Sequence, residues 1–204
     1  MADTYKNFKR LSAVEKEHVD FEIFTEKVKS RIAIVAPHGG GIEPGTSEIA
    51  RSISNGKYNC YCFEGIKSNK NRKLLHITST NFDEPECITL CQSSDTVVTI
   101  HGADDDDDIV FVGGLNEELK IAVIQKLKRV GFKAKQDTTR HSGQDIGNLC
   151  NKGTMKKGLQ LEISNGLRKK LFKGLKRKDR KSTTPTYDKF IEAIQSVLEE
   201  YQKG

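Results

Sequence analysis

Four ionisable side chains of the types that bind zinc or transfer protons lie in or just after apolar segments of this chain: His38, Glu43, His101 and Glu162. Two imidazoles and a carboxylate are a common ligand set of catalytic zinc, which keeps a fourth position for water. The metal acidifies this water, and a second carboxylate can accept its proton and pass it to a leaving amine. We therefore interpret the two histidines and Glu43 as candidate zinc ligands, and Glu162 as the candidate general base.

Each of these residues, taken alone, also has a simpler interpretation. A histidine after a strand is more often a structural or surface residue than a ligand, and Glu162 could face solvent from one side of a sheet. The pattern around His38 and His101 favours a metal site, because each follows an apolar segment and is itself followed by glycine. Whether the four side chains meet depends on the elements that carry them.

Residues 31–51 predict a buried strand, a glycine loop and a helix. Residues 32–36 are apolar and rich in β-branched side chains, which is typical of strands in sheets that are covered on both faces. Three glycines follow His38, and their conformational freedom allows a tight loop that returns Glu43 to the same ion. A helix over about 47–54 is expected next.

Alternating or continuous apolar residues predict further strands at 20–24, 59–63, 74–80, 95–100, 109–112 and 159–164. Helical periodicity predicts helices at 4–17, 85–92, 115–130 and around 190–198. This order predicts an α/β fold in which residues 1–204 form a single domain, with a mixed sheet and helices on both faces. Ligands of such sheets bind beyond the carboxyl ends of the strands, so the four ionisable residues are expected to meet there.

Three arginines are candidates for holding a substrate carboxylate or stabilising an oxyanion: Arg51, Arg140 and Arg168. Arg140 is the first choice, because it lies in a long polar segment, 136–158, that is rich in hydrogen-bond donors. A solvated surface arginine is the alternative for each. His76, in the expected strand 74–80, is a further candidate for substrate binding, with a buried structural histidine as its alternative. The run Asp104–Asp108 is expected to be a solvated turn.

Composition and charge narrow the class of protein. The chain of 204 residues is 35% hydrophobic, and no apolar run approaches the roughly 20 residues that a membrane helix requires. No apolar signal-peptide segment is present, so we expect cytoplasmic synthesis, with release on cell lysis for any extracellular role. The net charge of +6 favours a polyanionic partner, and charge alone does not distinguish nucleic acid, a membrane surface or an acidic polymer. Residues 168–181 are strongly basic but poor in aromatic side chains, so nucleic acid is not the expected partner. We expect a monomer.

Four segments together resemble one known family: APHGGGIEPGTSEIA, LHITSTNFDEP, TVVTIHGA and GLQLEIS. They are similar to segments of the poly-γ-glutamate hydrolases, small zinc-dependent enzymes of phages and of bacterial genomes with phage-derived genes. The resemblance covers nearly the whole chain and implies a fold like that of the zinc carboxypeptidases, with the metal at strand carboxyl ends. It also implies His38, Glu43 and His101 as zinc ligands, and Glu162 as the counterpart of the general base.

The expected function is hydrolysis of γ-glutamyl amide bonds in poly-γ-glutamate by a zinc-dependent enzyme. Its substrate carries one free α-carboxylate per residue, which suits a basic protein. Two alternatives remain open: a zinc deacylase or desuccinylase of small N-acyl amino acids, and a basic phage protein that binds nucleic acid. The first would share the zinc site but would need a closed pocket. The second would depend on residues 168–181 and would not use the histidines.

Overall fold

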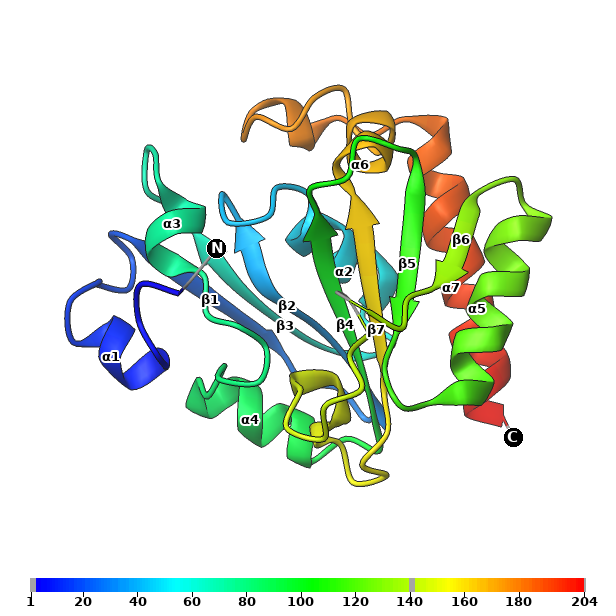
Figure 1. Cartoon of the computed structure of the whole chain (residues 1–204), viewed down its shortest axis with the longest axis horizontal. Helices are drawn as coiled ribbons and strands as arrows, with labels where there is room; N and C mark the ends of the chain where they lie inside the picture. Colours follow the sequence, from blue (N-terminus) through cyan, green and yellow to red (C-terminus); the bar gives the residue numbers. More distant parts are fainter. Residues whose placement is uncertain (1–2, 140–141, 204) are drawn as a thin grey trace.

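Seven strands form one mixed sheet through the centre of the protein, in the order β1-β3-β2-β4-β7-β5-β6 (Figure 1). The structure, a computed structural model, describes residues 3–139 and 142–203. The strands are β1 (Phe21–Glu26), β2 (Ile32–Gly40), β3 (Asn59–Gly65), β4 (Thr96–Ala103), β5 (Ile109–Gly113), β6 (Lys133–Gln136) and β7 (Leu159–Ser164). The four strands β3, β2, β4 and β7 run parallel, whereas β1 is antiparallel to β3 and β5 is antiparallel to β7. The last strand, β6, runs parallel to β5. The carboxyl ends of β2, β4 and β7 therefore meet at one edge, the upper edge in Figure 1.

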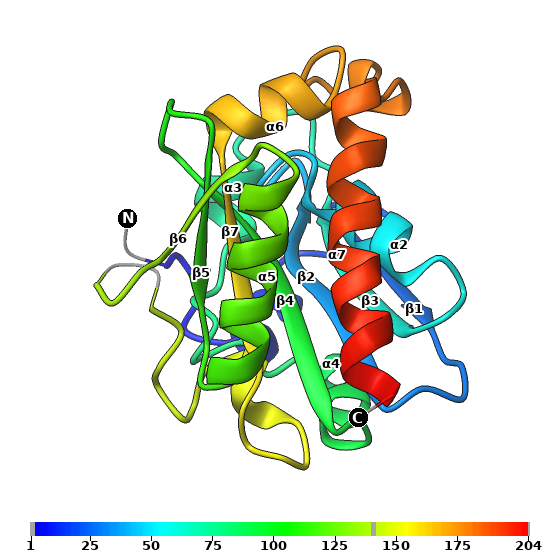
Figure 2. The same cartoon turned by 90° about the vertical axis from the view of Figure 1, so that its right-hand side faces the viewer.

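Helices cover both faces of this sheet (Figure 2). They are α1 (Phe8–Ser12), α2 (Thr46–Ser54), α3 (Asn71–Leu75), α4 (Pro85–Gln92), α5 (Glu117–Arg129), α6 (Asn165–Leu171) and α7 (Pro185–Lys203), with short 3-10 turns η1 (Leu149–Lys152) and η2 (Asp179–Lys181). The helices α2, α5 and α7 pack against one face, and α1 and α4 against the other. The predicted α/β fold, with a mixed sheet and helices on both faces, is confirmed.

The central strand β2 shows why its sequence is apolar throughout. Ile32 and Ile34 face the core under α2 and α7, whereas Ala33 and Val35 face the core under α4. All nine residues of β2 are buried. A strand with a core on each side has no face on which polar residues can alternate, which explains the continuous apolar run.

The helix α5 is bounded by the local signals that its sequence contains. The side chain of Asn116 accepts a hydrogen bond from the amide of Leu119 and so caps the first turn. Gly131, with φ of +88°, follows the last turn in the left-handed conformation that glycine adopts most readily. Leu119, Val123 and Leu127 are fully buried and attach the helix to the sheet. The prediction of this helix is confirmed.

Two predicted elements are wrong. The helix expected at 4–17 is limited to α1, because only Leu11 of its apolar stripe is fully buried and Val14 is 62% exposed. The strand expected at 74–80 is absent from the described residues, in which α3 occupies Asn71–Leu75 and an irregular extended segment follows. The alternation of that segment has another cause. Leu75 and Ile77 are buried in the core, and the histidine between them faces a cavity.

The long segment expected at 136–158 contains more structure than its polarity suggested. The strand β6 precedes it and pairs with β5, and η1 lies within it. Asn148 caps η1 by accepting a hydrogen bond from the amide of Cys150. In the two described ranges, the chain contains no helix that is both long enough and apolar enough to cross a membrane.

Candidate metal and catalytic site

The loop after β2 brings the first two predicted ligands together. The pairing of β2 with β3 shifts register between Ala36 and Gly39, and such an irregularity re-aims the side chain within it, here that of His38. Gly40 then has φ of +62°, and a Cβ atom there would lie 2.5 Å from the carbonyl oxygen of Gly65. Only glycine fits this close approach. The turn closes when the amide of Glu43 donates to the carbonyl of His38 at 2.8 Å.

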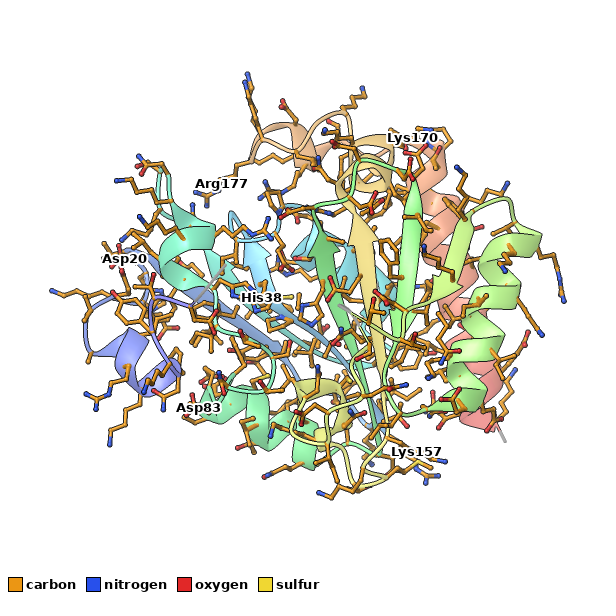
Figure 3. The ribbon with its side chains drawn as sticks, viewed as in Figure 1. Asp20, His38, Asp83, Lys157, Lys170 and Arg177 are labelled. Atoms are coloured by element: carbon orange, nitrogen blue, oxygen red, sulfur yellow. The ribbon has the colours of Figure 1, made fainter. Side chains whose placement is uncertain are left out.

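His101 reaches the same point from the neighbouring strand β4. Its Nδ1 atom lies 3.1 Å from Nδ1 of His38. The carboxylate of Glu43 lies beside both rings, with Oε1 at 3.3 Å from Nδ1 of His38 and Oε2 at 3.8 Å from Nδ1 of His101. All three side chains are buried, and His38 lies at the end of β2 near the centre of the molecule (Figure 3).

The separations of Nδ1 of His38 from its two neighbours match the donor set of a tetrahedral zinc ion. Nitrogen and oxygen ligands about 2.0–2.1 Å from zinc lie about 3.3 Å from one another at the tetrahedral angle. Nδ1 of His38 lies 3.1 Å from Nδ1 of His101 and 3.3 Å from Oε1 of Glu43, close to this value, whereas the contact of Glu43 with His101 is made by its other oxygen, Oε2, at 3.8 Å. Two imidazoles and a carboxylate are also the ligand types of catalytic zinc sites. The residues present therefore fit this metal.

Neighbouring groups orient each of these three side chains. Nε2 of His38 lies 2.8 Å from the carbonyl oxygen of Ile77, which can only accept, so this nitrogen carries hydrogen and Nδ1 keeps the lone pair in the neutral ring. Nε2 of His101 lies 3.3 Å from Oγ of Ser79. The amide of Gly102 donates to Oε2 of Glu43 at 2.8 Å. Such outer contacts fix the ring orientation of metal-binding histidines.

The charges of His38 and Glu43 shift the pKa values of both side chains. Burial lowers the pKa of His38, but attraction to the carboxylate of Glu43 outweighs this effect and the net pKa is raised. Burial raises the pKa of Glu43, but the two histidines and the amide of Gly102 lower it to about 2. Glu43 is therefore ionised at neutral pH, as a ligand of a cation must be.

Glu162 lies beside the ligands because of strand pairing. It is opposite His101 in the register of β7 and β4, and residues opposite one another project from the same face. Nε2 of Gln160 donates to Oε1 of Glu162 at 3.2 Å and holds the carboxylate in position. Both residues line a cavity of about 490 Å³, and the three candidate ligands line the same cavity. A cavity of this size accommodates a small molecule or one segment of a polymer.

His76 also faces this cavity, although its segment is not a strand. Its ring stacks on that of His38, with centroids 4.1 Å apart, and its Nδ1 pairs with Asp3 at 2.8 Å. Burial, followed by the charge of His38, lowers its pKa to about 4. Donor atoms of His38, Glu43 and His76 lie within 4.8 Å of one another, which makes this trio a second possible ligand set. Nε2 of His76 is 3.9 Å from Glu43, so it lies farther from that carboxylate than the nearer nitrogen of either other histidine.

The predicted arginines are placed differently. Arg51 pairs with Glu64, and its guanidinium lies 4.4 Å from the centroid of the Phe24 ring, outside the cavity. Arg168 is 3% exposed and binds backbone carbonyl groups, so the structure does not bring it into the cavity either. Arg140 lies outside the described residues.

Among the residues that the structure describes, the arginine that lines the cavity is Arg72, which sequence reasoning missed. It pairs with Asp104, the first residue of the aspartate run. The prediction of a strand at 74–80 placed Arg72 just before that strand, whereas in the structure Arg72 belongs to α3. The signal that could have found it is the combination of a basic segment and an unexplained acidic run near the candidate site.

The aspartate run is mostly exposed, as expected of a solvated turn, but three of its side chains form ion pairs. Asp106 pairs with Lys169, and Asp108 pairs with Lys170, both on α6. These pairs are exposed and contribute little stability each. They neutralise part of the basic segment 168–181.

A mixed α/β sheet that brings two candidate histidine ligands, Glu43 and Glu162 into one cavity at the carboxyl ends of its strands is an arrangement suited to hydrolysis. A model of the poly-γ-glutamate hydrolase family matches residues 5–193. The chain belongs to this family.

Individual relatives agree with this assignment. The UPF0714 protein YndL of Bacillus subtilis (strain 168) is 39% identical over 173 residues, which cover 83% of this chain and 67% of YndL. The structure of a bacteriophage poly-γ-glutamate hydrolase superimposes with a TM-score of 0.95 at 32% identity and covers 98% of both chains. A zinc-free apo structure of YndL gives a TM-score of 0.94 at 35% identity, over 98% of this chain and 99% of that one.

Proposed function

We propose that this protein is a zinc-dependent hydrolase that cleaves the γ-glutamyl amide bonds of poly-γ-glutamate. The observation that carries the proposal is the preformed donor set of His38, Glu43 and His101, with Glu162 beside it in one cavity. The family supports the substrate, and the existence of a form of YndL named as zinc-free supports the metal. A net charge of +6 suits a polymer with one carboxylate per residue.

Each residue of the site has a definite task in this reaction. His38, Glu43 and His101 would hold the zinc, which supplies an acidified water and polarises the amide carbonyl. Glu162 accepts a proton from the water at its carboxylate and donates it to the amide nitrogen as the bond breaks. Gln160 keeps Glu162 in position through its hydrogen bond. His76 faces the cavity as a neutral ring that can contact substrate.

A zinc deacylase of small N-acyl amino acids is the second candidate. The supporting observation is the cavity of about 490 Å³, a volume typical of sites for small molecules. Binding of nucleic acid has less support. Within the basic segment Arg168 and Arg180 are buried, and Lys169 and Lys170 pair with aspartates, so the exposed positive charge is smaller than the sequence suggested.

Replacement of the proposed base tests the mechanism. Glu162→Gln keeps the shape of the side chain but cannot accept the proton, so kcat on poly-γ-glutamate should fall by roughly 10²–10⁴-fold. Zinc content, measured by elemental analysis, should stay at one ion per chain. Glu118→Gln, which changes an exposed glutamate of α5, is the matched control and should retain full activity.

The assay follows product size by gel filtration, with and without a chelator. Loss of cleavage on chelation and its return with added zinc would support the metal. Turnover by Glu162→Gln above about one tenth of the wild-type value would contradict the proposed base. Cleavage of N-acyl amino acids without shortening of the polymer would favour the deacylase.

A further inference from the structure

An ion pair at the rim of the cavity has no role in the mechanism above. Arg72 of α3 pairs with Asp104, which follows β4, and both residues line the cavity. Their side chains are 41% and 67% exposed, respectively, so the pair is open to solvent and to an entering substrate.

Arg72 is a positively charged residue in a cavity that several carboxylates line. The lining includes four carboxylates: Glu43, Asp104, Asp105 and Glu162. Among the described residues that line the cavity, Arg72 is the only lysine or arginine. Zinc at the candidate site would offset two of these four negative charges, and without Arg72 the remaining charge would still repel a polyanionic substrate.

Arg72 is also held close to the site. The side chain of the neighbouring Asn71 accepts a hydrogen bond from the amide of Lys67 at 2.9 Å and donates one to the carbonyl of Lys67 at 2.8 Å. Asn71 packs so tightly on Gly41 that a Cβ there would lie 2.6 Å from its amide nitrogen. Because Gly41 belongs to the loop between His38 and Glu43, α3 is fixed directly to the ligand loop.

Electrostatics supports the same placement. The hydrogen bond with Asp104 raises the pKa of Arg72 most, and the charges of Glu43 and Glu162 raise it further. Arg72, Glu43 and Glu162 all line this cavity. A group held there can contact a substrate whose amide is at the candidate metal.

We infer that Arg72 recognises the α-carboxylate of the glutamyl residue beside the scissile bond, and that this carboxylate displaces Asp104 from the guanidinium. The inference rests on the proposed function, because it assigns a specificity residue for that reaction. Asp104 keeps the guanidinium oriented in the free protein and is released as substrate enters.

The expected magnitudes favour this exchange. A solvent-exposed ion pair such as Arg72–Asp104 typically changes an equilibrium by no more than about 5-fold. A forked guanidinium–carboxylate contact inside a cavity changes binding by roughly 10- to 100-fold. A substrate carboxylate can therefore replace Asp104 with a net gain.

The test compares two oligomers of γ-linked glutamate, one with free α-carboxylates and one with these groups converted to amides. Arg72→Gln should lower kcat/KM on the acid oligomer by roughly 10- to 100-fold, and Arg72→Lys should lower it less, because lysine retains charge but lacks the fork. On the amide oligomer, Arg72→Gln and wild type should have equal kcat/KM. Arg129→Gln, at an exposed arginine of α5, controls for the loss of one positive charge.

Asp104→Asn tests the displacement. It should raise kcat/KM on the acid oligomer by up to about 5-fold relative to Asp107→Asn, which removes the same charge from the same loop without freeing Arg72. Equal values for the two variants would overturn the displacement. Equal values for Arg72→Gln and wild type on the acid oligomer, or equal losses on both oligomers, would overturn the recognition.

Binding separates this inference from the proposed reaction. The affinity of zinc-loaded Glu162→Gln for the acid oligomer is measured by calorimetry, with and without Arg72→Gln. An affinity that depends on Arg72, together with a wild-type protein that cleaves no oligomer, supports the inference and refutes the reaction. An affinity that does not depend on Arg72 overturns the inference, whether or not the wild type is active.

Discussion

Replacement of Arg168 by methionine tests whether this buried arginine supports the site or binds substrate. Its Nε donates to the carbonyl of Ile163 at 3.0 Å, and its terminal nitrogens donate to the carbonyls of Pro44 at 2.7 Å and Ala103 at 3.0 Å. These carbonyls belong to the end of β7, the loop after Glu43 and the end of β4. One side chain therefore ties together the three segments that carry the candidate ligands and the base.

The cost of the substitution follows from these contacts. Methionine has similar length but leaves three carbonyl groups without their charged donor. Burial lowers the pKa of Arg168, yet a guanidinium remains charged at neutral pH, so all three bonds are charge-assisted. Breaking a buried polar cluster of this kind costs about 3–5 kcal/mol. For a chain of this size, that loss corresponds to a fall in Tm of roughly 6–20 °C.

Thermal unfolding followed by circular dichroism measures this effect, in the presence of chelator so that metal binding does not contribute. Arg168→Lys should lie between wild type and Arg168→Met, because one ammonium can satisfy only some of the three carbonyls. Arg129→Met changes an exposed arginine and should leave Tm within about 2 °C. A wild-type Tm for Arg168→Met, together with a raised KM, would refute the structural role and restore the substrate-binding role predicted from the sequence.

Two further substitutions probe the contacts around the ligands. Gly102→Ala places a Cβ 2.7 Å from Cζ of Arg168 and 3.0 Å from Cβ of Glu43, so it should destabilise the fold by about 1–3 kcal/mol and weaken zinc binding. Denaturant unfolding and zinc titration measure these effects, and unchanged values for both would contradict the packing described. Ser79→Ala removes the partner of Nε2 of His101 and should weaken zinc affinity by roughly 10- to 100-fold, measured by competition with a chelating dye. Unchanged affinity would show that Ser79 does not orient this ring.

Much of the candidate site could be predicted because local sequence and strand direction determine it together. The apolar runs before His38 and His101 predict buried strands, and parallel strands place their carboxyl ends at one edge. The opposition of His101 and Glu162 across β4 and β7 then follows from pairing. The structure brings these residues together with Glu43, whereas their roles as ligands and base remain predictions.

Both incorrect predictions rested on a pattern of apolar residues, which does not by itself show what those residues pack against. The strand expected at 74–80 failed because alternation of buried and exposed side chains does not require a neighbouring strand. There, Leu75 and Ile77 enter the core from α3 and an irregular segment. The helix expected at 4–17 failed because burial, and not periodicity, stabilises a surface helix, and Val14 finds no core to enter.

The sequence by itself determined the chemistry available at the carboxyl edge: two imidazoles, two carboxylates and a glycine loop short enough to join His38 to Glu43. Only the tertiary structure decided which arginine lies beside these ionisable groups. The sequence allowed Arg168 to bind substrate, but in the structure its guanidinium donates to three backbone carbonyls. The sequence did not single out Arg72, which α3 places at the cavity. The physical reason is that an apolar strand fixes the direction of its own side chains locally. The direction of a long charged side chain instead depends on partners distant in the sequence, here Pro44 for Arg168 and Asp104 for Arg72.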